Sequence, residues 1–306
     1  MKLKFLLLGL LIIVLSSIGN SIYFNAQQLD QPLFLEHYYV HQVGETPLKF
    51  YYIDNKFNQR KINYVTINGK TFHLQNNSFA FQHPNKPRNI TEYSHHALRE
   101  IFIYFNEPSV REIQLPFSFN DMTVHFNDGT SAKVDVGHVN VKKPSQFEKK
   151  PHIYTSRHYG SGSDGRAIES KQFHESAQIE SLSIPLEEVK GDFEVKLNTA
   201  KGTTKQEWRE EINKSKNHPI EPLMKAEWSE LPGGLFQDAE PYKIEQGKQL
   251  YIYTQIDLDK THMYLFRAQL NGTTDQGESF AIPLLLHEDP NLSSKDIQEL
   301  IKARGE

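Results

Sequence analysis

Residues 5–24 read FLLLGLLIIVLSSIGNSIYF, an almost unbroken apolar run that follows Lys2 and Lys4. A helix of this length crosses a hydrocarbon core of roughly 30 Å. Basic flanks are retained in the cytoplasm, and the next basic residue after the run is Lys49. We therefore predict that residues 1–4 are a cytoplasmic flank and that residues 5–24 are an uncleaved transmembrane signal-anchor. The rest of the chain is then expected outside the membrane.

Two alternatives stay open for this segment. The part from Phe5 to Leu15 has the length of a signal-peptide h-region, so a cleaved signal peptide and a secreted product are the first alternative. Cleavage needs small residues in an Ala-x-Ala-like pattern, whereas Phe24-Asn25-Ala26 places a large side chain there and Ser16–Gly19 offers a weak site. The second alternative is a buried core helix, which the extreme N-terminal position and the basic flank disfavour.

The composition restricts the compartment and the partners. None of the 306 residues is Cys, which excludes disulfides, thiol catalysis, thiolate metal sites and thioether lipid anchors. In an exported chain this composition fits a bacterial envelope. Residues 31–150 carry 14 Lys and Arg against 11 Asp and Glu, and residues 151–306 carry 18 against 26. Neither half has the basic surplus that a phosphate backbone requires, so we predict no nucleic-acid partner.

Residues 30–148 show short β-rich runs separated by turns. Asn68-Gly69 stands between two such runs, and this dipeptide favours a type I′ hairpin because both central residues need positive φ. Asn127–Thr130 marks a second hairpin, after which Val134 and Val136 alternate with polar residues. Such alternation is typical of a strand with one buried face. Strands with this spacing predict an immunoglobulin-like β-sandwich as the first domain.

The pattern changes over residues 149–170, where we expect a flexible linker because the stretch is rich in Gly, Ser and Pro-flanked lysines. A second β-rich domain is expected over residues 171–306. It should contain a short helix opened by the capping box Thr204–Glu207 and a C-terminal helix over residues 293–304. The alternative is one domain with a long mobile loop. The predicted fold class is thus mainly β, with a transmembrane or signal helix followed by two β-sandwich domains.

Motifs for cofactors and catalysis are weak in this sequence. Gly160–Gly165 fits G-x-G-x-x-G, but no convincing strand precedes it and no convincing helix follows, so a flexible loop is the better interpretation. His37 and His41 are spaced four apart, which suits zinc on a helix, whereas their neighbours favour a strand. Glu187-Glu188 is typical of a solvated face. We predict no catalytic residues, no cofactor and no metal.

The best candidate for a binding loop surrounds Leu231–Gly234. Flat aromatic rings beside carboxylates are a common way to build a sugar site. The predicted binding residues are Trp228, Phe236, Tyr242, Glu227, Glu230 and Asp238. The alternative is that these aromatic side chains pack a long loop against the second sheet.

These features favour a membrane-anchored or secreted extracytoplasmic protein that binds a partner, or holds an envelope assembly together, without catalysis. Besides the membrane itself, contacted through residues 5–24, the expected partner is another envelope protein or a wall glycan. The alternative function is an extracytoplasmic enzyme acting on wall carbohydrate or peptide, which would need a cleft with converging carboxylates. A metal-sensing or signalling ectodomain is a third hypothesis.

Overall fold

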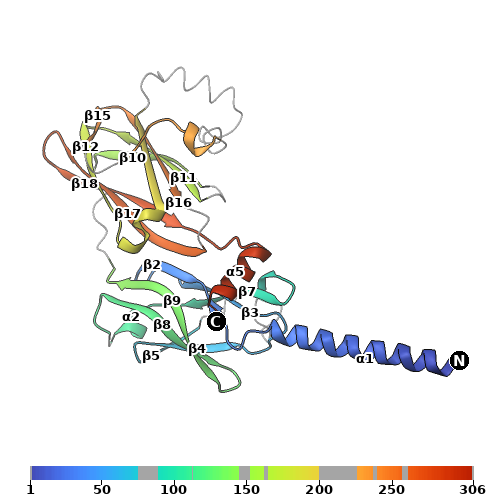
Figure 1. The fold of residues 1–306 in the computed structure, drawn as a ribbon. Coiled ribbons are helices and arrows are strands. Elements are labelled where there is room, and N and C mark those ends of the chain that lie inside the picture. Colours follow the sequence, from blue (N-terminus) through green and yellow to red (C-terminus); the bar gives the residue numbers. More distant parts are fainter. Residues whose placement is uncertain are drawn as a thin grey trace. The chain divides into compact units, whose positions relative to one another are not determined.

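The chain divides into two compact units that are each rich in strands (Figure 1). The first unit comprises residues 1–37, 43–142 and 290–306, and the second comprises residues 38–42 and 143–289. Strands dominate both units, which confirms the mainly β fold class. The computed structural model describes residues 2–74, 89–111, 113–144, 152–161, 165–199, 226–236, 240–256 and 261–304.

Helix α1 (Lys2–Ala26) covers the apolar run at the N-terminus. Its stretch Gly9–Ala26 is long and apolar enough to cross a membrane, and none of that stretch is buried. Figure 1 shows α1 extending away from the strands of the first unit. Leu10, Ile13 and Ile22 are 57%, 69% and 66% exposed. A helix that is apolar on all sides needs an apolar environment, as a membrane anchor or a signal sequence has.

The first unit contains two antiparallel sheets. One has the order β1-β3-β7-β6, and in the other β9, β8, β4 and β5 are successive neighbours. The ring centroids of Phe50 in β3 and Phe119 in β8 lie 6.3 Å apart, so the two sheets pack face to face. Strand β2 (Glu36–Gln42) is divided between the units after His37. The other elements are β1 (Leu33–Phe34), β3 (Leu48–Asn55), β4 (Ile62–Ile67), β5 (Lys70–His73), β6 (Asn89–Glu92), β7 (His96–Ile103), α2 (Glu107–Val110), β8 (Phe117–Phe126) and β9 (Ser131–Lys142).

Both hairpins expected in this unit are present. Asn68 and Gly69 have φ values of 49° and 76° between β4 and β5, which are the positive values that a type I′ turn needs. Gly129 has a φ of 84° in the turn between β8 and β9. In β9, Val134 and Val136 are buried, whereas Lys133 and Asp135 are exposed. Local turn chemistry and period-two alternation were sufficient to predict these strands.

The second unit is a sandwich of two sheets around one apolar core. The sheet order is β10-β11-β16-β13-β14 on one side and β15-β12-β17 on the other, with β18 paired to β17. Alternate residues of β13 and β16 pack in the same cluster as alternate residues of β17 and β18. The elements are β10 (Tyr154–Ser161), β11 (Arg166–Phe173), β12 (Ala177–Ser183), η1 (Glu187–Asp192), β13 (Phe193–Thr199), η2 (Trp228–Glu230), β14 (Gly234–Leu235), β15 (Tyr242–Ile244), β16 (Gln249–Ile256), β17 (His262–Thr274) and β18 (Ser279–His287).

The linker expected over residues 149–170 is replaced in the structure by strand β10 and the first half of β11. Gly160 and Ser161 of the Gly160–Gly165 motif are the last residues of β10, residues 162–164 lie outside the described residues, and Gly165 directly precedes β11. Strand β11 pairs with β16 from Arg166 to Gln172. Gly160 and Ser161 pair with Ile168 and Ala167 of β11. The stretch therefore joins a sheet through β11, and that sheet also needs β16, a strand distant in sequence that local composition does not reveal.

The C-terminal helix α5 (Ser294–Arg304) is capped as the sequence predicts. The Ser293 N–H donates to Oδ2 of Asp296 at 2.7 Å, and the Asp296 N–H donates to Oγ of Ser293 at 3.3 Å. We expected this helix in the second domain, but it belongs to the first unit, where Ile297 is buried. Capping is a local signal, whereas docking depends on long-range contacts. The helix expected at Thr204–Glu207 lies outside the described residues.

Candidate functional site

Trp228, in the 3-10 helix η2, packs on the five-stranded sheet of the second unit. Its indole Nε1–H donates to Oε2 of Glu194 at 2.7 Å. The Lys196 ammonium lies 4.8 Å from the indole ring centroid and donates to the Trp228 carbonyl oxygen at 2.6 Å. Beneath the ring lie Tyr251 and Tyr253, which are both buried. Together, the ring, the cation and the carboxylate hold this loop against the sheet.

Phe236 and Tyr242 pack on the opposite side of this sheet, against the core of the sandwich. The Tyr242 hydroxyl accepts the backbone N–H of Thr199 at 2.7 Å. Successive side chains of β16 alternate between the face that contacts Trp228 and the face that forms the core. The structure therefore does not bring Trp228 together with Phe236 and Tyr242.

The predicted acidic residues of this loop have local roles where they are described. Glu227 and Glu230 are exposed, and the Glu227 N–H donates to Oε2 of Glu230 at 3.2 Å. Asp238 lies outside the described residues. Sequence reasoning missed Glu194 and Lys196 as neighbours of Trp228, although their alternation with apolar residues in β13 indicated a shared outer face. A binding role for the six predicted residues stays a prediction.

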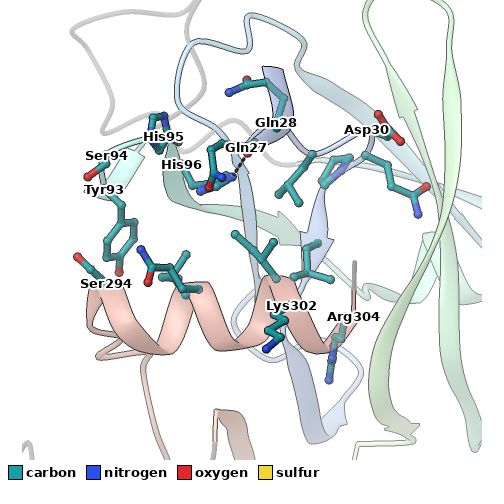
Figure 2. A pocket seen from close by; sticks show the side chains of 18 residues that line it. Gln27, Gln28, Asp30, Tyr93, Ser94, His95, His96, Ser294, Lys302 and Arg304 are labelled. Atoms are coloured by element: carbon teal, nitrogen blue, oxygen red, sulfur yellow. Dashed lines mark hydrogen bonds between the residues drawn. The ribbon is translucent and has the colours of Figure 1, made fainter. Parts of the chain in front are cut away.

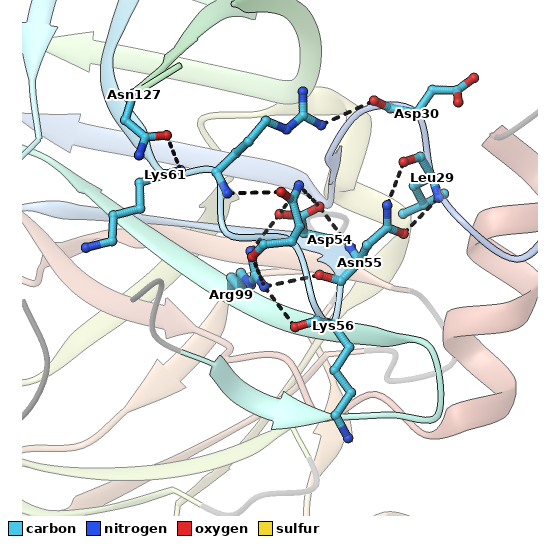
Figure 3. A network of polar contacts seen from close by, with 10 residues as sticks. Leu29, Asp30, Asp54, Asn55, Lys56, Lys61, Arg99 and Asn127 are labelled. Atoms are coloured by element: carbon cyan, nitrogen blue, oxygen red, sulfur yellow. Dashed lines mark hydrogen bonds and ion pairs between the residues drawn. The ribbon is translucent and has the colours of Figure 1, made fainter. Parts of the chain in front are cut away.

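The most extensive buried polar network described in the first unit centres on Arg99 in β7 and Asp54 in β3 (Figure 3). The Arg99 Nη1 donates to Oδ2 of Asp54 at 2.7 Å, and both side chains are almost fully buried. The Arg99 Nη2 donates to the backbone oxygens of Asn55, Lys56 and Asn58 at 3.1, 3.4 and 3.1 Å. One guanidinium thus fixes the backbone of the loop that follows β3.

The sequence carried one signal for this network. Arg99 occupies an inward position in β7, in the alternation that also buries Ala97, Ile101 and Ile103. A charged residue among core-facing positions needs a buried partner, because an unpaired charge in the interior is very costly. The partner, Asp54, could not be identified from spacing because β3 and β7 pair only in the folded sheet.

The same loop is tied to the segment that follows α1. The side chain of Asn55 accepts the Leu29 N–H at 2.8 Å and donates to the Leu29 carbonyl oxygen at 2.7 Å (Figure 3). His96 Nε2 donates to the Gln27 carbonyl oxygen at 2.9 Å, and burial lowers the pKa of His96. The end of α1 is therefore held to the strands of the first unit by three hydrogen bonds.

A pocket of about 610 Å³ lies beside this attachment, between the segment 26–33, the turn Tyr93–His96 and helix α5 (Figure 2). Its wall combines apolar side chains, among them Leu33, Ile297 and Ile301, with polar ones. The charged side chains are of both signs, with Asp30 on one side and Lys302 on α5. Among the described residues, no three His, Asp or Glu side chains are grouped so as to hold a metal ion. The pocket can accept a small polar group, and it offers hydrogen-bonding and charged side chains of both signs.

His37, one of the two histidines considered for zinc, is a satisfied core residue. Its Nε2 accepts the Tyr51 N–H at 2.9 Å, and its Nδ1 lies 3.1 Å from the Val136 carbonyl oxygen, to which it donates. Burial lowers the pKa of His37 to about 3. The neutral imidazole thereby bridges a strand of each sheet.

No protein-family model matches the chain. No curated protein matches it either. Among solved structures, a chain described as the D00-D0 domain of intimin is 7% identical, with a TM-score of 0.19, and the alignment covers 84% of this chain and all of that one. We draw no functional conclusion from this similarity.

Proposed function

We propose that this protein is anchored in a membrane by α1, with residues 1–4 in the cytoplasm and both β-rich units outside. Its work is to bind an envelope component or to hold an envelope assembly together, without catalysis. The observation that supports this proposal is the combination of an apolar helix with no buried residue over Gly9–Ala26 and three hydrogen bonds that attach the segment after it to the first unit. A segment that is only to be removed by a signal peptidase needs no such attachment.

The alternative, a secreted protein with a cleaved leader, makes a different prediction for the mass of the mature chain. We expect the membrane fraction to contain a chain that retains residues 5–24 and that resists extraction at alkaline pH. A mature protein that lacks these residues and appears in the medium would overturn the anchor.

The absence of Cys from the whole sequence allows a direct test of topology. Lys133 lies in the first unit, and its side chain is 70% exposed. We expect the Lys133→Cys variant to react with a membrane-impermeant maleimide as completely in intact cells as in lysed cells. Reaction only after lysis would place the first unit in the cytoplasm and refute the proposal. The unmodified chain is the blank, because it has no thiol.

The binding role has its own test. Cells that produce a tagged full-length chain are treated with a crosslinker, and the products are compared with those of a chain that carries α1 alone before the tag. We expect crosslinks to an envelope protein or to wall glycan that require the β-rich units. Identical products from both chains would leave the units without a partner and would contradict this role.

A further inference from the structure

The loop that follows β3 presents a large apolar side chain to the outside. Phe57 is 64% exposed, the highest value among the described large apolar side chains outside α1. Exposed phenylalanines are common, but the backbone of this loop is hydrogen-bonded to a buried side chain. Arg99 donates to the carbonyl oxygens of Asn55, Lys56 and Asn58, on both sides of Phe57. The backbone that carries Phe57 is therefore held in place by a buried network.

Phe57 lies beside the last turns of α1. Its ring centroid is 6.5 Å from that of Phe24, and the ring of Phe24 is 6.0 Å from that of His95. Tyr23 contacts the same imidazole, with ring centroids 5.7 Å apart. Three aromatic side chains and an imidazole thus gather where α1 meets the first unit. We call Tyr23, Phe24, Phe57 and His95 the aromatic collar.

The collar stands at the level where a membrane would end. The apolar stretch suited to crossing a bilayer is Gly9–Ala26, so Tyr23 and Phe24 lie in its last turn. Trp and Tyr are enriched at this level in membrane proteins because their rings are amphipathic, and Tyr23 is of this kind. Phe is among the apolar side chains with which interfacial segments enter the boundary between headgroups and acyl chains. Phe57 is brought to this level from a loop of the first unit rather than from the helix.

The flanking charges fit a membrane surface. Lys56 precedes Phe57 and pairs with Glu92 at 3.0 Å, while its ammonium lies 6.0 Å from the Phe57 ring centroid. Arg60 and Lys61 follow within the same loop, so the segment from Lys56 to Lys61 carries three basic residues and no acidic one. Basic residues near a bilayer attract anionic lipid headgroups.

We infer that the aromatic collar is a lipid-binding surface. Phe57 inserts into the headgroup region of the outer leaflet, where the C-terminal end of α1 leaves the membrane. The occupant is the membrane itself, and the consequence is that the first unit rests against the bilayer. This inference depends on the membrane anchoring proposed above. It adds a second contact with lipid, made by a residue far from α1 in the sequence.

The test uses the full chain in lipid vesicles, where the lack of native thiols permits a single label. Phe57→Cys and Leu235→Cys are each labelled with an environment-sensitive fluorophore. Leu235 is a matched control because it is also apolar and 50% exposed, but it belongs to the second unit. Nitroxide lipids placed at the headgroup or in the acyl region serve as quenchers.

We expect the label at position 57 to emit at shorter wavelength than the label at position 235 in the same vesicles. Headgroup nitroxides should quench it at least threefold more than they quench the label at position 235. Equal, weak quenching at both positions would overturn the inference. Stronger quenching in vesicles with anionic lipid than in neutral ones would support a contribution from the basic residues, and equal quenching would support insertion of the aromatic side chain alone.

Failure of the anchor and failure of the collar give different results. If α1 does not anchor the chain, alkaline washing releases the labelled protein from the vesicles and the proposed function fails. If the protein stays bound while position 57 remains in water, only the inference about the collar fails. Thermal unfolding of each labelled variant checks that the exposed substitutions leave the fold intact.

Discussion

Asn55 and Leu29 exchange two hydrogen bonds, since the Asn55 amide accepts the Leu29 N–H and donates to the Leu29 carbonyl oxygen at 2.8 and 2.7 Å. The Asn55 side chain thus makes the two hydrogen bonds to Leu29 that the backbone of a neighbouring strand would make in a β-sheet. It joins the end of β3 to the segment that leads out of α1. The junction between α1 and the strands of the first unit is thus a structured contact.

Replacing Asn55 with Ala should free this junction. Loss of both bonds costs about 1 to 2 kcal/mol, by the usual net contribution of a hydrogen bond. We expect the Leu29 amide to exchange with deuterium about tenfold faster, as measured on the full chain in detergent. Buried amides of β8, such as that of Val124, are the internal control. An unchanged exchange rate at Leu29 would show that other contacts hold the segment.

Arg99 should be indispensable to the first unit. Its removal leaves the Asp54 carboxylate buried without a partner, which costs about 3 to 5 kcal/mol. We expect the Arg99→Met variant to unfold at a much lower temperature in calorimetry. Arg99→Lys should rescue little, because an ammonium cannot reach the carboxylate and three carbonyl oxygens as a planar fork does. The double variant Asp54→Asn with Arg99→Met should be less destabilised than Arg99→Met alone.

The stability of the first unit should fall in acid because of His37. The pKa of His37 is lowered to about 3 in the folded state by burial, whereas it is near 6.5 in the unfolded chain. Between these two pH values the unfolded state binds more protons than the folded state. The contribution of neutral His37 to the free energy of unfolding is therefore fully present above about pH 6.5 and is lost as the pH falls toward 3. The slope approaches about 1.4 kcal/mol per pH unit for this group.

The measurement for His37 is the free energy of unfolding at several pH values from 7 down to 4. His37→Gln removes the titrating group, so its stability should depend less steeply on pH even if the variant is weaker throughout. His96, whose pKa is also lowered by burial, acts in the same direction and remains in both chains. Parallel curves for the two chains would contradict the assignment.

Gly272 should tolerate no side chain. A Cβ at this position would lie 2.2 Å from the Gln178 carbonyl oxygen and 2.7 Å from the ring of Phe280. We expect Gly272→Ala to lower the stability of the second unit by about 1 to 3 kcal/mol, because the strands must separate to admit a methyl group. Gly191→Ala is the matched control, since no atom lies within 4 Å there. The measurement is the thermal unfolding temperature of both variants. Equal temperatures for Gly272→Ala and Gly191→Ala would contradict the prediction.

Trp228 offers a test of the predicted binding loop. If its role is to pack the loop on the sheet, Trp228→Ala should cost about 2 kcal/mol, and the loop should become sensitive to protease. Trp228→Phe keeps the apolar contact but leaves Glu194 without its indole donor, so a smaller loss is expected. Unchanged stability together with lost retention on cell-wall glycan would instead favour the binding role.

Local signals were enough for much of this fold. Asn68-Gly69 predicted its hairpin because positive φ is a property of two adjacent residues, and Ser293 with Asp296 predicted the start of α5 for the same kind of reason. The candidate site was different. Trp228 and Tyr242 are close in sequence, but the side of the sheet that each contacts depends on how β13 and β16 pair.

The sequence by itself determined the apolar helix, the short strands and their turns, because length, alternation and turn chemistry act over a few neighbouring residues. Only the tertiary structure decided that Arg99 meets Asp54, that residues 154–161 and 166–170 join a sheet, and that Phe57 lies beside Phe24. Each of these contacts joins residues separated by long stretches of chain. Their formation depends on the burial and pairing of whole strands, which no local pattern encodes.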